Sequence, residues 1–195
     1  KQGIDEPTEI QAQSIPALFK GRDVLAQAQT GTGKTLAFLF SALQQIRTDL
    51  SREQVLIVAP TRELAKQIAD VAETLAPALS VDVLSLIGGK TIENQLQKLH
   101  RHPHIIIGTP GRLLDHCNRN SLDLSNVKRV IVDEADQMLQ AGFLEDIDML
   151  ISMTPKSRQL LFFSATIPDK IRNLAKKHMT NPLVLNVREG ETIAL

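Results

Sequence analysis

Residues 28–35 have the types and spacing of a loop that binds phosphate. They read Ala-Gln-Thr-Gly-Thr-Gly-Lys-Thr, which fits the pattern GxxxxGK[ST] except that Ala28 stands where the pattern has its first glycine. Glycines allow backbone N–H groups to turn toward phosphate oxygens, and a helix that follows directs its positive end at them. Lys34 then reaches the β- and γ-phosphates, and Thr35 offers its hydroxyl to Mg²⁺. The segment predicts a nucleotide site rather than a glycine turn that only starts a helix.

An acidic pair, Asp133 and Glu134, follows the apolar residues 130–132. In ATPases with a phosphate loop, a carboxylate at the end of such a strand holds Mg²⁺, and a neighbouring carboxylate orients the attacking water. We assign these two roles to Asp133 and Glu134, and we count Lys34 as the third catalytic residue. Exposed acids at a strand end are common and alone mean little. The phosphate loop in the same chain favours the catalytic interpretation.

These two segments need a scaffold that brings distant strand ends together. Short apolar runs alternate with longer amphipathic stretches, which is typical of an α/β domain with a mostly parallel sheet and helices on both faces. The expected strands are residues 24–26, 55–59, 81–86, 105–107, 130–132 and 160–163, with 184–187 as a weaker candidate. The expected helices are residues 34–46, 62–76, 92–99, 112–119, 144–151 and 169–177.

Polar or glycine-rich segments follow six of the expected strands. Because the carboxyl ends of parallel strands lie at one edge of a sheet, and such sheets bind ligands there, this edge is expected to be the working surface. The six segments are residues 31–35, 60–61, 88–89, 109–112, 133–136 and 164–166.

The composition is that of one ordinary domain: 195 residues, 43% hydrophobic and 23% charged. Equal numbers of basic and acidic residues, 22 of each, argue mildly against a nucleic-acid binder, although a local cluster can bind phosphate on a neutral protein. No run approaches the roughly 20 apolar residues of a membrane span, so no membrane contact is expected. The single cysteine excludes an internal disulfide and favours a cytoplasmic location.

Two further sets of side chains are weaker site candidates. Cys117 could be a reactive thiol, but a packing or surface role is expected for it on a helix. His100, His102 and His104 lie close together, yet no cysteine or second cluster completes a zinc set. A solvated basic turn before a strand is the expected reading of the three histidines.

Residues 133–136 spell Asp-Glu-Ala-Asp, and with residues 28–35 they resemble the DEAD-box RNA helicases. The resemblance covers almost the whole chain and implies a RecA-like P-loop domain, the N-terminal half of an ATP-dependent RNA helicase that couples RNA-stimulated ATP hydrolysis to local duplex unwinding. Further segments match in the family's order: residues 3–11 resemble the Q motif, 60–65 motif Ia, 88–89 the GG element, 109–112 motif Ib, and 164–166 the SAT motif.

The resemblance implies ATP and Mg²⁺ as cofactors and gives roles to single residues. Gln11 is expected to read the adenine edge with an amide that donates and accepts at once, and Thr8 to support the loop. Ser164 and Thr166 are expected to couple nucleotide state to strand separation by hydrogen bonding to Asp136. The implied metal ligands are Thr35 and Asp133. The implied nucleotide-binding set is Thr8, Gln11, Thr30, Gly31, Thr32, Gly33, Lys34 and Thr35.

The resemblance also implies a path for an RNA sugar–phosphate backbone, read without regard to sequence. Arginines, hydroxyls and bare backbone N–H groups suit such contacts. Internal salt bridges are the alternative for the two arginines, above all for Arg62, which lies next to Glu63. The implied RNA contacts are Thr61, Arg62, Gly88, Gly89, Thr109, Gly111 and Arg112.

The chain departs from the family pattern at both ends. The aromatic residue that the family places upstream of the Q motif is absent, because the chain begins two residues before Gly3. Nothing after residue 166 resembles the second RecA-like domain, which carries arginine fingers. We expect residues 1–187 to form the N-terminal domain and residues 188–195 to begin a linker to a C-terminal RecA-like domain of the same protein. Alone, this piece is expected to be monomeric and nearly inactive.

Two other functions fit the phosphate loop. A related ATPase could move protein or DNA, and the Q motif and residues 133–136 favour RNA over these substrates. A domain without catalysis could act as a nucleotide-responsive binding module, and the presence of Glu134 argues against a degenerate site.

Overall fold

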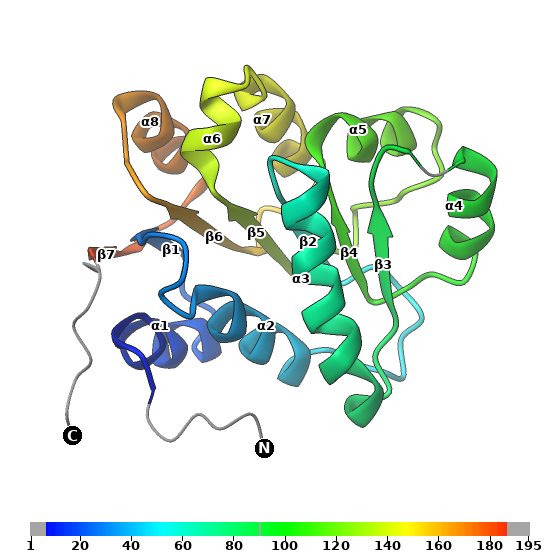
Figure 1. The fold of residues 1–195 in the computed structure, drawn as a ribbon, viewed down its shortest axis with the longest axis horizontal. Coiled ribbons are helices and arrows are strands. Elements are labelled where there is room, and N and C mark those ends of the chain that lie inside the picture. Colours follow the sequence, from blue (N-terminus) through cyan, green and yellow to red (C-terminus); the bar gives the residue numbers. More distant parts are fainter. Residues whose placement is uncertain (1–6, 90, 187–195) are drawn as a thin grey trace.

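The computed structural model describes residues 7–89 and 91–186, which form one α/β domain around a seven-stranded sheet (Figure 1). Every strand pairing is parallel, and the order is β3-β4-β2-β5-β6-β1-β7. The predicted fold class is therefore confirmed, with a sheet that is parallel throughout its described strands. The strands are β1 Val24–Gln27, β2 Val55–Val58, β3 Val83–Leu86, β4 Ile105–Gly108, β5 Arg129–Asp133, β6 Gln159–Ser164 and β7 Leu183–Asn186.

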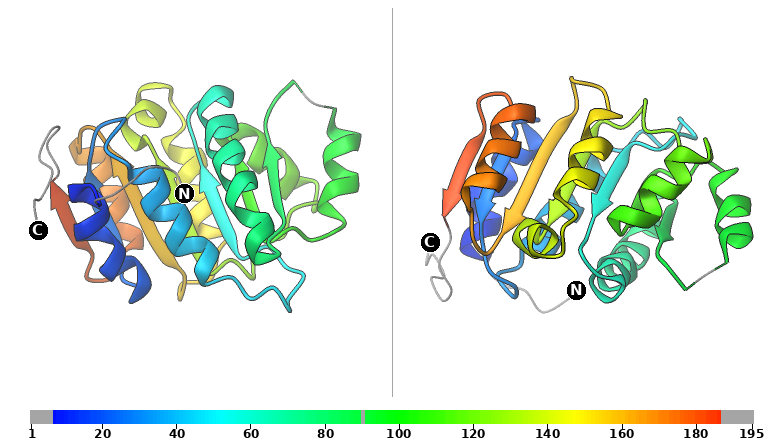
Figure 2. Two further views of the ribbon diagram at one scale, coloured as in Figure 1. Left: turned by 60° about the horizontal axis from the view of Figure 1, so that its bottom comes forward. Right: turned by 90° about the horizontal axis from the view of Figure 1, so that it is seen from above.

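Helices cover both faces of this sheet. In Figure 2, α1, α2 and α3 stand in front of the sheet in the left view, and α5, α7 and α8 stand in front of it in the right view. The helices are α1 Glu9–Phe19, α2 Lys34–Gln44, α3 Arg62–Leu75, α4 Ile92–Leu99, α5 Pro110–Asn118, α6 Ala135–Gln140, α7 Leu144–Ser152 and α8 Asp169–His178, with a 3₁₀ turn at Ala76–Leu79.

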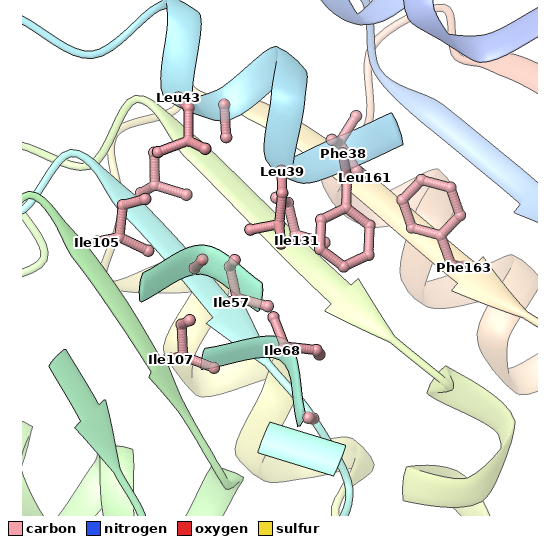
Figure 3. Packing of buried hydrophobic residues seen from close by; sticks show 14 of the residues in the cluster. Phe38, Leu39, Leu43, Ile57, Ile68, Ile105, Ile107, Ile131, Leu161 and Phe163 are labelled. Carbon is pink, nitrogen blue, oxygen red and sulfur yellow. The ribbon is translucent and has the colours of Figure 1, made fainter. Parts of the chain in front are cut away.

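Two hydrophobic clusters hold these layers together, one on each face. The central strands are continuous apolar runs because successive side chains point to opposite faces and both faces are buried. Thus Ile57 packs toward α2 and α3, whereas its neighbour Leu56 belongs to the cluster on the other face. Figure 3 shows the first cluster, where Phe38 lies near Phe163 with ring centroids 5.4 Å apart.

The expected elements are found with shifts of a few residues at their ends, and two helices were not predicted. Helix α1 was missed because its apolar periodicity is weak and Pro16 lies inside it. Helix α6 has only six residues and follows the acidic pair directly, too short for a periodic pattern to appear. Helix α5 begins at Pro110 rather than residue 112, since proline suits the first position of a helix. Residue 187 of the seventh strand prediction lies outside the described residues.

The histidine prediction is partly wrong. His104 is buried, with 5% of its surface exposed, and its Nδ1 accepts a hydrogen bond from the backbone N–H of Asp82 at 2.9 Å. The described residues contain no group of three His, Cys, Asp or Glu side chains placed to hold a metal ion. Cys117 is half-buried against the second hydrophobic cluster, and burial raises the pKa of its thiol to about 11. Within the described residues, no helix is long and apolar enough to cross a membrane.

Arg129, the first residue of β5, ties three elements together at the amino edge of the sheet. The residue is 5% exposed. Its guanidinium donates to the carbonyl of Ser41 in α2 at 3.1 Å and to the carbonyl of Leu18 at the end of α1. It also donates to the side-chain oxygens of Gln45 and Gln159. Burial lowers the pKa of Arg129 to about 10, so it stays charged at neutral pH. Helix C-termini suit a cation, because their carbonyls carry partial negative charge.

We predict that Arg129→Ala lowers the free energy of unfolding by about 3 kcal/mol, because buried carbonyl and amide oxygens lose their donor. Urea denaturation of the chain measures this difference. The neighbouring exposed Lys128 supplies the control, since Lys128→Ala should change stability by no more than about 0.5 kcal/mol. Equal effects of the two substitutions would show that the buried network contributes little.

Candidate functional site

The loop between β1 and α2 is shaped by glycines with left-handed backbone. Gly31 and Gly33 have φ of 90° and 85°, a region that other residues rarely adopt. Ala28, which replaces the first glycine of the pattern, is buried and extends β1 by donating its N–H to the carbonyl of Ser164 at 2.9 Å. Helix α2 begins at Lys34, so its unpaired N–H groups and positive end face the loop.

Lys34 lies against both carboxylates of the acidic pair. Its Nζ is 2.8 Å from Oδ1 of Asp133 and 3.7 Å from Oε1 of Glu134, although 99 residues of sequence separate the first pair. All three side chains are buried, and the Asp133 side chain is fully covered. Such a buried ion pair persists because each charge compensates the lost hydration of the other. The phosphate loop and the acidic pair therefore form one cluster.

Asp133 and Glu134 differ in their surroundings. Burial raises the pKa of the Asp133 carboxyl, and the Lys34 ammonium opposes that rise. The second oxygen of Asp133, Oδ2, is buried and has no hydrogen-bond partner among the described residues. A buried, unpartnered carboxylate oxygen is costly unless a cation or water reaches it, so Asp133 fits a metal ligand.

Glu134 is held in a strained turn between β5 and α6. Its φ of 53° and ψ of 52° are left-handed, which is unfavourable for a residue with a side chain and is often found at functional sites. Its Oε1 accepts a hydrogen bond from the hydroxyl of Thr30 at 3.0 Å. The carboxylate, at the end of β5, therefore contacts the phosphate loop that follows β1. In the loop, the hydroxyl of Thr32 donates to the carbonyl of Gln29 at 2.9 Å.

Thr8 and Gln11 cap α1 and contact the phosphate loop at the same time. The Gln11 side chain accepts from the N–H of Thr8 at 3.0 Å, and the Thr8 hydroxyl accepts from the N–H of Gln11 at 3.5 Å, which forms a capping box. The Gln11 amide also donates to the carbonyl of Gly33 at 3.2 Å. A Cβ on Gly33 would come within 2.7 Å of that amide nitrogen, and the φ of 85° is one that residues with a side chain rarely adopt, so glycine is favoured there. Residues 3–6 of the predicted Q motif lie outside the described residues.

Asp136 joins the acidic segment to the end of β6. Its N–H donates to the Ser164 hydroxyl at 3.0 Å, and its Oδ2 accepts from both the N–H and the hydroxyl of Thr166, at 3.1 and 2.9 Å. Gln27, at the end of β1, adds a bond from its amide to the carbonyl of Ala165 at 3.0 Å. The segment 164–166 is therefore fastened to both β1 and α6.

Arg62, Gly88 and Gly89 come together at the carboxyl ends of β2 and β3. A Cβ on Gly88 would lie 2.8 Å from the Arg62 guanidinium, and one on Gly89 would lie 3.3 Å from it. The absence of side chains lets this exposed arginine rest on the loop. No ion pair between Arg62 and Glu63 is found in the described part of the chain. Thr61 caps α3 by accepting from the N–H of Leu64 at 3.1 Å.

Arg112 lies on α5, close behind the end of β4, and donates to Oε1 of Gln95 at 3.2 Å. The same oxygen accepts a hydrogen bond from Nε2 of His116 at 2.8 Å. The Gln95 amide nitrogen donates to the carbonyl of Ile87 at 2.9 Å. Thr109 precedes α5, and Gly111 is exposed with open space where a Cβ would be.

Gln95, Gln27 and His116 are site neighbours that the sequence analysis missed. Gln95 is 2% exposed and shares the buried face of α4 with Leu99, four residues later. That i, i+4 spacing was the available signal, because a polar residue in register with an apolar stripe must find partners inside. Burial together with Arg112 lowers the pKa of His116.

The sheet order sorts the candidate residues into two halves of one edge. Thr8 and Gln11 lie at the start of α1, and the other nucleotide and metal candidates follow β1 and β5. The coupling candidates join β5 and β6, which are neighbours in the sheet. The candidate RNA contacts follow β2, β4 and β3, the other half. In the first half Lys34 contacts the acidic pair, and in the second half Arg62 lies against residues 88–89.

The sequence of the chain matches a family profile and is similar to those of known proteins. The profile of the DEAD/DEAH box helicases matches residues 8–174. The "DEAD-box ATP-dependent RNA helicase CshA" of Geobacillus kaustophilus is 46% identical over 191 residues, which cover 98% of this chain and 41% of that protein. The "ATP-dependent RNA helicase DeaD" of Buchnera aphidicola is 45% identical, over 98% of this chain and 32% of that protein.

A solved structure agrees with these relatives. The crystal structure of a DEAD box protein from Methanococcus jannaschii matches with a TM-score of 0.89 at 40% identity, over 93% of this chain and 50% of that chain. The chain therefore spans half or less of the length of these proteins. The family profile covers most of the length of this chain, and the chain therefore belongs to the DEAD/DEAH box helicase family.

Proposed function

We propose that the chain is the N-terminal, ATP-binding half of an ATP-dependent RNA helicase, which couples RNA-stimulated ATP hydrolysis to local duplex unwinding. The observation that carries this proposal is the buried cluster of Lys34, Asp133 and Glu134 at the start of α2. The names of the relatives add RNA as the substrate, and the lone cysteine fits a cytoplasmic protein. The remaining length of the relatives would supply a C-terminal RecA-like domain.

Nucleotide binding replaces the internal ion pair of Lys34. With ATP in the loop, its ammonium turns from Asp133 to the β- and γ-phosphates, whose charge is larger. Thr35 and the unpartnered oxygen of Asp133 would hold Mg²⁺, which when bound neutralises developing negative charge on the phosphates. N–H groups of residues 31–35 and the positive end of α2 complete the cradle.

Glu134 acts on water in this proposal. Once the nucleotide has drawn Lys34 away, the carboxylate is positioned by the Thr30 hydroxyl and its constrained backbone. It can then orient a water molecule toward the terminal phosphate. Asp136, through Thr166 and Ser164, would transmit the state of the acidic segment to the end of β6.

RNA would bind along the ends of β2, β3 and β4. The exposed guanidinium of Arg62 over Gly88 and Gly89, with Thr61, Thr109, Gly111 and Arg112, offers charge, hydroxyls and bare backbone suited to phosphates. None of these groups favours one base over another, so binding should be independent of sequence.

We predict that Lys34→Ala lowers the affinity for ADP with Mg²⁺ at least about tenfold, because the phosphates lose their cation. The domain should stay folded, since the carboxylate left behind can take up a proton. Calorimetric titration measures the affinity, circular dichroism checks the fold, and Lys170→Ala on the exposed start of α8 is the control. Unchanged affinity in a folded variant removes Lys34 from the phosphate site.

We predict that the chain prefers adenine over guanine nucleotides and that Gln11→Ala narrows this preference. Because Gln11 also caps α1 and contacts Gly33, the substitution weakens both affinities, and the ratio of ADP to GDP affinity is the informative quantity. Gln13→Ala, on the same helix, should leave the ratio unchanged. Equal binding of GDP and ADP to the unsubstituted chain would contradict the adenine role.

We predict that the chain alone hydrolyses ATP far more slowly than about one turnover per second and separates no duplex. An arginine supplied by a second domain is worth about 10³ to 10⁵ in rate in related phosphoryl transfers. Steady-state ATPase with no nucleic acid, RNA or DNA, beside a strand-displacement assay, tests this. RNA-stimulated turnover at one per second or above would contradict the half-motor proposal, and stimulation by DNA alone would favour a DNA motor.

A further inference from the structure

Strand β3 forms one end of the sheet, and its outer edge pairs with none of the described strands. The carbonyl of Asp82 accepts from the N–H of Ile105 at 3.1 Å, so the backbone groups of residues 82, 84 and 86 point toward β4. Backbone groups of successive strand residues alternate in direction. The N–H and C=O of Val83 and Ser85 therefore face outward.

Helix α4 stands beside this edge (Figure 1). A cavity of about 330 Å³ lies between the strand and the helix. Residues 82–85 form the wall on the strand side. The helix side is polar and is formed by Asn94, Gln95, Lys98 and Arg101. The cavity is thus an open groove that runs along an unpaired strand.

Gln95 shows what the groove can bind, because it already satisfies one group of the open edge. Ile87 is the next residue after Ser85 whose backbone groups point away from β4. Its carbonyl accepts a hydrogen bond from the Gln95 amide at 2.9 Å. The side-chain amide takes the place that a neighbouring strand's N–H would occupy. In the described part of the chain, no other side chain does this for Val83 or Ser85.

The charges of the groove differ between its walls. Lys98 and Arg101 are exposed on the α4 side and form no ion pair with the described residues. Glu73 and Asp82 line the groove near the start of β3. A ligand with carboxylates would be attracted to the α4 wall and repelled from the opposite one, which fixes how it lies.

We propose that this groove binds an extended acidic peptide segment of a partner protein, which adds to the sheet as a strand beside β3. An extended backbone presents N–H and C=O groups at the two-residue spacing of Val83 and Ser85, and this main-chain pairing supplies the affinity. Its acidic side chains face Lys98 and Arg101. A nucleic acid satisfies the cations but offers no donors in register with the outward carbonyls.

The test uses a labelled, capped peptide of about eight residues with alternating valine and aspartate, titrated into the chain by fluorescence anisotropy. We expect saturable binding that falls at least about tenfold when alternate peptide amides are N-methylated. Lys98→Glu should weaken binding at least about fivefold. Lys176→Glu, on exposed α8 at the far end of the sheet, is the matched control and should change nothing.

A second variant tests the strand edge itself. Ser85→Pro removes an outward N–H and no bond to β4, and edge strands tolerate proline, so the fold should survive while peptide binding is lost. If this variant unfolds, the binding of the N-methylated peptide to the unsubstituted chain tests whether main-chain pairing supplies the affinity. Equal binding of the methylated peptide, or of one with lysine for aspartate, overturns the proposal. Self-association abolished by Ser85→Pro overturns it in favour of a second copy, and displacement of the peptide by a short RNA assigns the groove to nucleic acid.

The groove is separate from the nucleotide site, so the two proposals fail independently. ADP affinity should be the same in the Lys98→Glu variant as in the unsubstituted chain, whatever the peptide does. Gln95, however, also accepts from Arg112, which places one shared side chain between the groove and a candidate RNA contact.

Discussion

A buried lysine that faces two buried carboxylates is the constraint on which the rest of the site depends. Lys34 places one basic group against the two carboxyl groups of Asp133 and Glu134, in a place from which water is largely excluded. Removing such charges from water is unfavourable unless they compensate each other or find an ion. Among the described residues, Oδ2 of Asp133 has no hydrogen-bond partner, so the cluster suits a cation that arrives together with an anion for Lys34. That is the charge pattern of a magnesium nucleotide.

The parallel sheet makes this meeting of distant residues possible. Because all described strands run in the same direction, the segments that follow them end at one edge. The order β5-β6-β1 places the acidic pair two strands away from the phosphate loop. Lys34, the first residue of α2, spans this distance with its long side chain and contacts Asp133. At the opposite edge, Arg129 begins the same strand that ends in Asp133 and anchors the C-termini of α1 and α2. One strand thereby contacts both ends of α2, which carries Lys34, and the C-terminal end of α1.

Backbone without a covering side chain or neighbouring strand occurs at three places in this domain, with a different consequence at each. Gly33 is needed because Gln11 and Thr8 press against it, which connects the first helix to the phosphate loop. At Gly88 the missing side chain leaves room for the Arg62 guanidinium. At β3 the exposed backbone groups are those of the sheet edge, which pairs with none of the described strands and lies beside a groove. Native proteins usually cover such edges, and α4 covers only the end nearest Ile87 through Gln95.

The sequence by itself determined the α/β class, the seven strands, most of the helices between them, and the segments that form the edge. It did so because apolar runs and glycine-rich strings are local patterns. The roles assigned to single residues remain proposals, but the motifs predicted that the phosphate loop and the acidic pair lie at one edge of the sheet. What the sequence could not decide depends on partners far apart along the chain. The burial of Gln11, Gln95, His104 and Arg129, and the open edge of β3, were settled only by the order of the strands and the helices packed on them. A polar side chain shows its partner only when the fold brings the two together.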